Sequence, residues 1–301
     1  MSVLVVGSMA FDSIETPHGR ADRVLGGSAA YFALAAAVFA PVRIVGVVGE
    51  DFPEEHLTAL SRSGVDLEGL QRAAGKTFFW HGRYHEDLNV RDTLEVQLNV
   101  LGDFDPRLPA GYEDTEYVFL GNMHPAAQSE VLSQLKQPRL VACDTMDHWI
   151  NENPGELRKV LERVETVVIN DSEARMLSGH DNIVRAARAI LKMGPRAVLI
   201  KRGEYGVFQF SDDSTFVVPA YPLEDVLDPT GAGDSFAGAF MGCLAAGGAN
   251  GDEGLRRAIV YGNVTASFTV EDFGPRRLLT LERGEVDERY RRFVELTRFH
   301  D

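Results

Sequence analysis

Cysteine is scarce in this chain of 301 residues, which has only Cys143 and Cys243. Both lie in apolar stretches far from each other, so we expect two buried, reduced thiols. A disulfide framework or a cysteine-based zinc site would need more of them. Long hydrophobic runs are missing as well, and the first residues, MSVLVVGS, lack the basic start and the long apolar stretch of a signal peptide. These absences predict a cytoplasmic protein that does not bind a membrane.

Positive charge is also in short supply. Lysine and arginine number 30 against 45 aspartates and glutamates, which gives a formal net charge of −15. Such a surface repels nucleic acid and anionic lipid, so neither is an expected partner. Binding of a small anion such as ATP is compatible with this net charge, because helix N-termini and a few local cations can bind it against the overall negative field. The hydrophobic content of 45% suits a globular enzyme, and we expect a single domain over residues 1–301.

Several catalytic motifs are absent. The sequence has no G-x-x-x-x-G-K-[ST], no G-x-G-x-x-G after the first expected strand and no G-x-S-x-G. We therefore do not expect a P-loop kinase, a dinucleotide-binding dehydrogenase or a hydrolase with a nucleophile elbow. His81 and His85 have the spacing H-x-x-x-H but no third ligand, which favours surface residues over a zinc site.

Short β-branched runs alternate with helical patterns along most of the chain. Buried strands are expected at 3–7, 42–49, 116–120, 140–144, 166–170 and 197–201, and two closely spaced strands at 206–210 and 215–219. Helices are expected at 26–40, at 52–62, from 231 onward, at 253–268 and at 286–299. This order predicts a doubly wound α/β fold, with a mostly parallel sheet sandwiched by helices.

The rhythm breaks between residues 76 and 101. The stretches TFFWHGRYH and TLEVQLNVL flank a turn-rich segment, and the alternation of Leu94, Val96, Leu98 and Val100 indicates antiparallel strands with one wet face. Together with residues from about 11 to 25, this region is expected to form a small β lid. Pairing two lids would bury their strand edges and apolar face, so a homodimer through the lid is a further expectation.

The clearest local signal is DPTGAGDSF, from Asp228 to Phe236, where a glycine-rich turn leads into an apolar-periodic helix. Exposed N–H groups at such a junction form an anion site, and Gly231 and Gly233 allow backbone conformations that a Cβ would block. Asp234 would repel a bound phosphate, yet it suits the removal of a proton from an attacking hydroxyl. On spacing alone, a helix N-cap is an alternative role for Asp234.

The string DPTGAGDSFAGAF resembles the C-terminal signature of the ribokinase/PfkB carbohydrate kinases, and the similarity runs over nearly the whole chain. The resemblance implies an ATP-dependent kinase that phosphorylates a hydroxyl of a sugar or sugar-like substrate, with Mg²⁺ bound alongside ATP. Asp234 would be the catalytic base. The N–H groups of Gly231, Ala232 and Gly233 would stabilise the transferring phosphoryl group.

The resemblance also assigns the substrate side of the site. The start VVGSMAFDSI, with Asp12, is similar to the family's first strand and its substrate-binding aspartate. The pair Gly26 and Gly27 resembles the di-glycine hinge of the family's lid, and Tyr31 lies in the helix that follows. Asp12, Gly26, Gly27 and Tyr31 are therefore the expected substrate-binding residues.

The nucleotide side of the site is assigned from two further segments that resemble the family, NDSE at 170–173 and KRGEYG at 201–206. The implied ATP-binding residues are Asn170, Lys201, Gly203, Gly206, Thr230, Gly233 and Asn263. Asn170 and Glu173 would reach Mg²⁺ through water, and Asp228 and Thr230 would hold a monovalent cation such as K⁺. Structural alternatives stay open: a capping arrangement at 170–173, a solvated strand end at 201 and a proline-containing turn at 228–230.

Departures from the family pattern bear on the substrate. A sugar-binding asparagine usually opens the helix after the glycine pair, but Tyr31 stands here, and Ala10 or Phe11 replaces a polar residue of ribose kinases. The expected lid carries the aromatic residues Phe78, Phe79 and Trp80. Rings stack well on aromatics, so a nucleoside is an alternative substrate, although packing within the lid or a dimer explains these residues equally. A catalytically silent regulatory protein that binds nucleotide or sugar, and a donor other than ATP, also stay open.

Overall fold

The computed structural model describes residues 1–247 and 251–298. Within these ranges, nine strands form the main sheet in the order β13-β12-β11-β10-β9-β8-β1-β4-β5. The strands from β11 to β5 run parallel, and β12 and β13 form an antiparallel hairpin at one edge. Their bounds are β1 Val3–Val6, β4 Val42–Val48, β5 Val65–Arg72, β8 Tyr117–Leu120, β9 Leu140–Cys143, β10 Thr166–Asn170, β11 Ala197–Lys201, β12 Val207–Ser211 and β13 Thr215–Val218.

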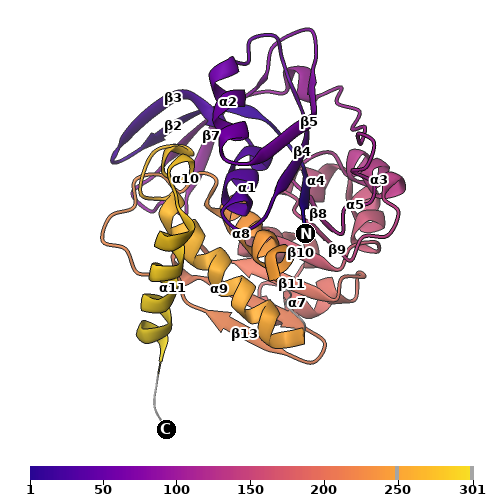
Figure 1. Ribbon diagram of the computed structural model, residues 1–301. Coiled ribbons are helices and arrows are strands. Elements are labelled where there is room, and N and C mark those ends of the chain that lie inside the picture. Colours follow the sequence, from indigo (N-terminus) through magenta and orange to yellow (C-terminus); the bar gives the residue numbers. More distant parts are fainter. Residues whose placement is uncertain (248–250, 299–301) are drawn as a thin grey trace.

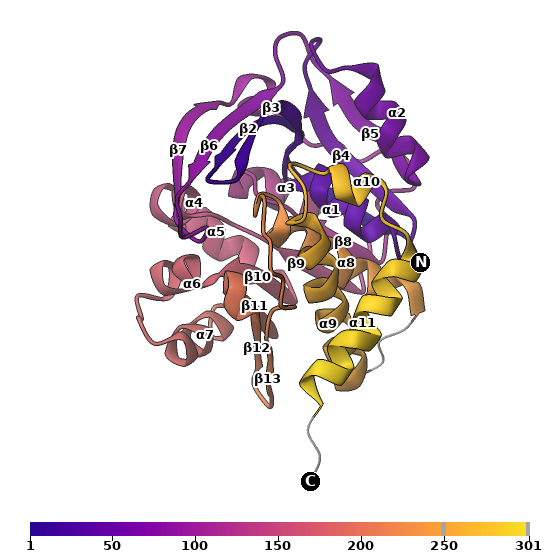
Figure 2. The same cartoon turned by 90° about the vertical axis from the view of Figure 1, so that its left-hand side faces the viewer.

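Helices cover both faces of this sheet. One layer consists of α1 Ser28–Ala37, α2 Glu54–Arg62, α8 Ala232–Gly247, α9 Gly251–Thr269, α10 Arg276–Leu279 and α11 Arg283–Thr297. The other consists of α3 Pro125–Gln134, α4 Asp147–Glu152, α5 Pro154–Leu161, α6 Asp171–Ser178 and α7 Ile183–Leu191. Figure 2 shows the strands between α5, α6 and α7 on the left and α1, α9 and α11 on the right. The doubly wound α/β prediction is confirmed.

Strand β1 shows why the sheet lies at the centre. Val3 and Val5 pack into the core under the α1 layer, and Leu4 and Val6 pack into the core under the α3 layer. Both faces of the strand are therefore buried, which accounts for its unbroken apolar sequence. None of the helices in residues 1–247 and 251–298 combines the length and the apolar character that crossing a membrane requires.

A second sheet of four strands, called here the small sheet, has the order β3-β2-β6-β7. Its strands are β2 Ala10–Thr16, β3 Gly19–Gly26, β6 Phe78–Tyr84 and β7 Arg91–Gln97. In Figures 1 and 2 it lies at the upper end of the molecule, and α7 and the β12–β13 hairpin lie at the lower end. These strands fall within the two ranges expected to form a lid. The pair β6 with β7 is antiparallel, which confirms the expectation for residues 76–101, and β2 joins β6 in parallel.

Other local expectations also need correction. Strand β5, Val65–Arg72, was missed because its sequence, VDLEGLQR, alternates with polar residues and has few β-branched ones. All seven residues of β7 are exposed, so this edge strand is wet on both faces rather than one. Helix α1 begins at Ser28, after the glycine pair rather than at it. The expected end of the last helix at Phe299 lies outside the described residues.

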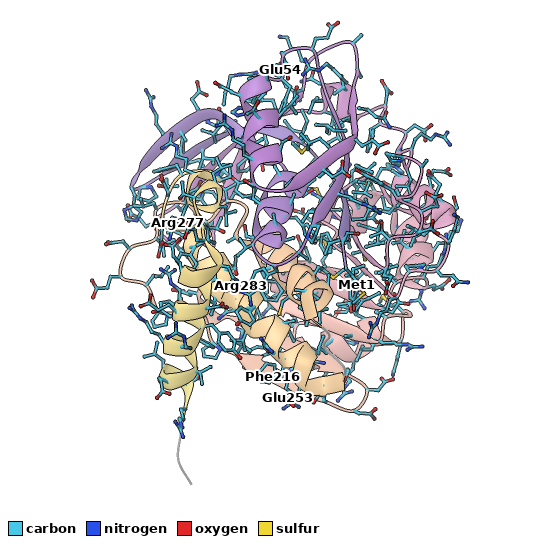
Figure 3. The ribbon with its side chains drawn as sticks, in the orientation of Figure 1. Met1, Glu54, Phe216, Glu253, Arg277 and Arg283 are labelled. Atoms are coloured by element: carbon cyan, nitrogen blue, oxygen red, sulfur yellow. The ribbon has the colours of Figure 1, made fainter. Side chains whose placement is uncertain are left out.

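Close packing between helices positions the residues at the start of α8. A Cβ at Gly238 would lie 2.2 Å from the carbonyl oxygen of Phe32, so α8 approaches α1 more closely than any larger residue would permit. The C-terminal helix secures the same layer, because Arg283, labelled in Figure 3, lies over the rings of Phe39 and Tyr261 at 4.5 and 5.1 Å. The glycine-rich turn before α8 is thus held on a rigid base.

Candidate active site

The glycine-rich turn is fixed by backbone hydrogen bonds to a buried carboxylate. The two oxygens of Asp228 accept bonds from the N–H groups of Thr230 and Gly274, each at 2.8 Å. Gly231 has φ +74°, and a Cβ there would lie 2.2 Å from the ring of Tyr31. Only glycine fits such a position, because its backbone is left-handed and a ring occupies the space beside it.

Asp234 lies in the first turn of α8, which begins at Ala232. It is therefore inside the helix rather than at the N-cap position that the sequence left open. Burial raises the pKa of this carboxyl to about 7, with a contribution from Asp144, and the positive charges of Lys201 and Arg91 oppose the rise. A carboxylate of this kind, at a helix N-terminus, can accept a proton near neutral pH.

A buried ion pair lies next to the turn. The Lys201 ammonium, at the end of β11, is 3.5 Å from a carboxylate oxygen of Asp144, which follows β9. A Cβ at Gly233 would lie 2.9 Å from Lys201 Nζ, so the ammonium reaches the glycine-rich turn. Lys201 is thus a partly buried, paired cation and not a solvated strand-end charge. Its position suits contact with a phosphate.

Asn170 and Glu173 form a capping box at the start of α6. The Asn170 side chain accepts from the Glu173 N–H at 2.8 Å, and the Glu173 carboxylate accepts from the Asn170 N–H at 2.7 Å. Burial raises the pKa of Glu173 to about 8, and the neighbouring charge of Asp144 adds to this effect. The capping alternative is therefore present in the structure. Among the described residues, no group of three or more His, Cys, Asp or Glu side chains is arranged to hold a metal ion directly.

Asp12, on β2 of the small sheet, is buried against the glycine pair. A Cβ at Gly26 would lie 2.1 Å from a carboxylate oxygen of Asp12, and a Cβ at Gly27, where φ is +93°, would lie 2.4 Å from the Ser8 carbonyl oxygen. Burial raises the pKa of Asp12 to about 7, and a hydrogen bond from the Gly27 backbone opposes the rise. The glycine pair thus makes room for the Asp12 carboxylate.

The Tyr31 hydroxyl is buried without a hydrogen-bond partner. Burial raises the pKa of this hydroxyl above its ordinary value, and the nearby carboxylates of Asp12 and Asp228 raise it further. A buried polar group without a partner is uncommon in a folded protein. Tyr31 therefore offers an unused hydrogen-bonding group among the carboxylates of the site.

The small sheet contacts the main body at two places near this cluster. The Thr230 hydroxyl donates to the Tyr84 hydroxyl at 3.1 Å. The Asn89 amide donates to Glu204 at 3.4 Å, in the short 3₁₀ turn η2, Gly203–Tyr205. A Cβ at Gly203 would lie 2.0 Å from the Asn89 side-chain oxygen. The end of β6 and the turn between β6 and β7 therefore contact the segments expected to bind ATP.

The similarity of the chain to known proteins decides its family. Residues 2–281 match the profile of the pfkB family carbohydrate kinases. The chain belongs to this family. As a pfkB-family kinase, it transfers a phosphoryl group from ATP to a hydroxyl of a sugar or sugar-like substrate.

Relatives of this pfkB-family kinase include sugar and nucleoside kinases. It is 35% identical over 247 residues to the cytidine kinase of Thermococcus kodakarensis, covering 80% of this chain and 87% of that protein. It is 28% identical over 308 residues to the ribokinase of Bacillus subtilis, covering 95% and 98% of the two chains. Similar solved structures include the nucleoside kinase of Burkholderia thailandensis in complex with inosine, with a TM-score of 0.80, 20% identity and coverage of 99% and 100%. A putative ribokinase II from E. coli in complex with ATP and Mg²⁺ has a TM-score of 0.78, 22% identity and coverage of 97% and 99%.

Some expected residues of the pfkB-family kinase have structural partners of their own. The Asn263 amide donates to the Pro219 carbonyl oxygen at 2.9 Å and so ties α9 to the loop after β13. Gly206 has φ +86°, and a Cβ there would lie 2.0 Å from the Val218 carbonyl oxygen. His81 and His85 lie 3.1 and 2.9 Å from the carboxylates of Glu15 and Asp92. Each histidine has its own acidic partner, as expected for residues outside a zinc site.

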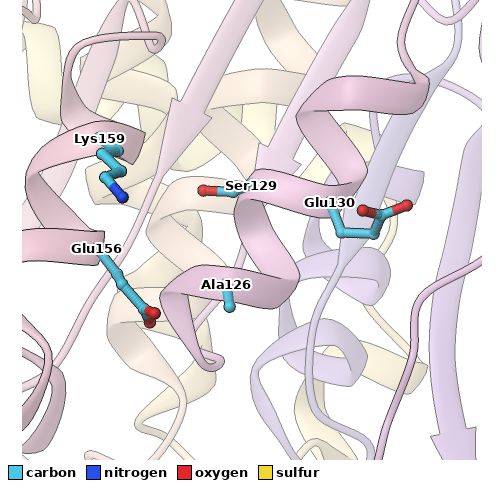
Figure 4. Close-up of a pocket in the computed structure, with 5 residues that line it drawn as sticks. All are labelled: Ala126, Ser129, Glu130, Glu156 and Lys159. Atoms are coloured by element: carbon cyan, nitrogen blue, oxygen red, sulfur yellow. The ribbon is translucent and has the colours of Figure 1, made fainter.

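Sequence reasoning missed Asp144, Tyr84 and Arg91. Asp144 carries a usable signal, because it directly follows a buried parallel strand, at the edge of the sheet where ligands bind. Tyr84 and Arg91 pair across β6 and β7, and nothing in their local sequence indicates that they face the carboxylates. The small cavity of about 270 Å³ in Figure 4 lies elsewhere, between α3 and α5. Its lining residues are Ala126, Ser129, Glu130, Glu156 and Lys159.

Proposed function

We propose that Asp234 is the catalytic base of this kinase. The observation that carries the proposal is a carboxylate inside the first turn of α8, beside the glycine-rich turn and the Lys201 ammonium. Asp234 takes the proton of the substrate hydroxyl as its oxygen attacks the γ-phosphorus of ATP. The new O–P bond forms while the bond to the β-phosphate oxygen breaks, and ADP leaves. The N–H groups of Gly231, Ala232 and Gly233 and the helix dipole stabilise the charge on the transferring group.

The substrate would be held on the side of the small sheet. The Asp12 carboxylate accepts hydrogen bonds from substrate hydroxyls, and the backbone of Gly26 and Gly27 keeps it in place. Tyr31 supplies its unused hydroxyl as a further partner, which satisfies a group that is otherwise buried and unpaired. Closure of the small sheet as a lid would exclude water, which would otherwise hydrolyse ATP.

ATP would lie across the other side of the site. Lys201, Gly203, Gly206, Thr230 and Asn263 border this region, and we place the protein in the cytoplasm because it consumes ATP. Mg²⁺ would screen the phosphate charges. Asn170 and Glu173 would reach this ion through water. One Glu173 oxygen accepts the Asn170 N–H, so the other oxygen would hold a water ligand of the ion.

A monovalent cation site is also proposed, at Asp228 and Thr230. Both Asp228 oxygens accept backbone N–H groups, so a cation such as K⁺ would use their remaining lone pairs. A homodimer through the small sheet is proposed as well. It is supported by the exposed edge strand β7, whose side chains include Leu94 and Val96 at 43% and 50% exposure.

A nucleoside is the second candidate substrate. The similarity to a cytidine kinase over most of this chain favours it, and so does Tyr31, which stands where sugar kinases of the family usually have an asparagine. The phosphorylated group would again be a sugar hydroxyl, so the chemistry at Asp234 is the same for both candidates.

The experiment that tests the function measures ATP consumption with Mg²⁺ and K⁺ against nucleosides, pentoses, hexoses and polyols. Asp234→Asn is measured in parallel, because the amide has nearly the same shape and cannot accept the proton. We expect one substrate group to drive ATP consumption and the variant to lower kcat by about 10²- to 10⁴-fold, with an unchanged circular dichroism spectrum. Near-normal turnover in the variant would remove Asp234 from this role. ATP binding without transfer to any compound would favour a regulatory protein instead.

A further inference from the structure

Trp80 lies on the same face of the small sheet as Asp12. Strands β2 and β6 pair in parallel with Asp12 directly beside Trp80, and directly paired residues of neighbouring strands point to the same face. The next pair back, Phe11 with Phe79, faces the other way. There both rings contact the guanidinium of Arg23, at 4.4 and 5.5 Å, and Phe11 contacts Phe52. The aromatic residues of this strand are thus divided between two environments.

The indole of Trp80 is held by two specific contacts. A Cβ at Gly82 would lie 2.0 Å from the six-membered ring, so the ring lies directly over the Gly82 backbone. The indole N–H donates to the Thr93 hydroxyl on β7 at 3.4 Å. The exposed Arg91 side chain lies 5.5 Å from the ring centroid and is long enough to move aside. Trp80 is therefore oriented by its neighbours and is only partly buried, at the margin of the cluster formed by Ile14, Ala21, Tyr84 and Phe273.

The chain's other tryptophan provides a contrast. Trp149, on α4, donates its indole N–H to the Asn122 side chain at 2.9 Å. The imidazoles of His124 and His148 lie against its ring, with centroids at 5.0 and 4.5 Å. Both the indole N–H and the ring of Trp149 therefore have partners within the fold. Trp80 instead keeps part of its aromatic surface exposed, one strand away from a buried carboxylate suited to sugar hydroxyls.

We propose that the face of Trp80 turned away from Gly82 stacks on the heterocyclic base of a nucleoside whose ribose is bound by Asp12. The inference rests on the proposed kinase function and names the substrate class of that site. Neighbouring strands lie about 4.8 Å apart, a separation close to that between a ribose ring and its base. Gly82 is the residue that makes the stacking position available. A side chain there would push the indole off the strand.

Binding can be tested without catalysis, because the chain contains only two tryptophans. In Trp149→Phe, Trp80 is the sole indole, and titration with cytidine, uridine, adenosine or inosine in the absence of ATP should change its fluorescence. Free ribose should not, and ATP alone should change it far less than the best nucleoside. If Trp149→Phe does not fold, the fluorescence change of Trp80 is obtained by subtracting the change seen in Trp80→Phe from that of the wild type. Equal responses to ribose and nucleosides, or no response to any nucleoside, would overturn the proposal.

Kinetics supply the second test, through the ratio of kcat/KM for the best nucleoside to kcat/KM for ribose. Trp80→Ala should lower this ratio by about 5- to 150-fold, the usual range for loss of one stacked base. Trp80→Phe should retain most of it, because a phenyl ring still stacks. Gly82→Ala keeps the tryptophan but displaces its ring, so it should lower the ratio as Trp80→Ala does. An unchanged ratio in Trp80→Ala and Gly82→Ala would refute the stacking role while leaving the kinase function intact. If the wild type transferred phosphate to none of the compounds, the kinase proposal itself would fail.

Discussion

At the scale of single residues, the site gathers acidic groups that most proteins keep apart. Asp12, Asp234 and Glu173 all have pKa values raised by burial, to about 7, about 7 and about 8. Lys201 and Arg91 supply the nearby positive charge that limits this effect for Asp234. Such a cluster is unfavourable in the absence of ligands, which is typical of a site arranged for catalysis rather than for stability.

The pH dependence of the kinase follows from Asp234. The carboxyl must be ionised to accept a proton, and with a pKa of about 7 its ionised fraction rises through neutral pH. We expect kcat/KM to fall about tenfold per unit below about pH 6.5, and more steeply if Asp12 must also be ionised. A pH–rate profile checks this, with Asp12→Asn as the control that should leave a single ionisation. A rate constant that does not change between about pH 5 and about pH 9 would contradict the assignment.

The raised pKa of Asp234 also makes the stability of the folded protein depend on pH. A raised native pKa means that the folded protein binds the proton more tightly than the unfolded chain does. The resulting stabilisation is complete below the unfolded value and is lost as the pH rises from about 4 towards about 7. Asp234→Asn should therefore raise the melting temperature of the ligand-free protein more at pH 8 than at pH 5. A larger effect at pH 5 would show that burial does not dominate this carboxyl.

At the scale of elements, the turn between β6 and β7 meets η2 through Asn89 and Gly203. Gly203→Ala places a Cβ 2.0 Å from the Asn89 side-chain oxygen, at a backbone φ of +54°. We expect it to push the two segments apart and to raise KM for ATP several-fold. The double variant Gly203→Ala/Asn89→Ala should recover part of this loss, because the clash is gone and only the backbone strain remains.

A matched control isolates the backbone strain. Gly179 ends α6 with φ +69°, and a Cβ there would have no neighbour within 4 Å. Gly179→Ala should cost about 1 kcal/mol of stability and leave KM for ATP unchanged. If Gly203→Ala behaved like Gly179→Ala, contact between the small sheet and η2 would have no part in ATP binding.

At the scale of the whole molecule, two edge strands expose apolar side chains to a similar degree. Val96 on β7 is 50% exposed, and Val217 on β13 is 51% exposed. If the protein dimerises through the small sheet, Val96→Lys should shift sedimentation equilibrium towards the monomer, since a charge at a paired edge is unfavourable. Val217→Lys should leave the equilibrium unchanged. A wild type that sediments as a monomer at high concentration would contradict the proposed dimer.

Features encoded by neighbouring residues could be predicted from the sequence, and features that depend on distant segments meeting could not. The apolar run at 3–7 and the DPTGAGDSF string are contiguous, so both the parallel sheet and the glycine-rich turn could be identified from neighbouring residues. The proximity of Asp144 and Lys201 could not, because it needs the parallel order of β9, β10 and β11. Strand β5 was missed for a related reason, since its half-polar sequence forms a strand only through pairing with β4.

The sequence by itself determined the doubly wound fold and the turn that carries Asp234, because strand and helix periodicity and turn chemistry act between residues close along the chain. The family followed from the resemblance of the contiguous DPTGAGDSFAGAF string. The tertiary structure decided which groups face one another. It put Trp80 on the Asp12 face and Phe79 on the other, left the Tyr31 hydroxyl without a partner, and joined Asn170 to Glu173 in a capping box. Register is the physical reason, since a shift of one residue between β2 and β6 would exchange the two faces and place Phe79 instead of Trp80 on the face of Asp12.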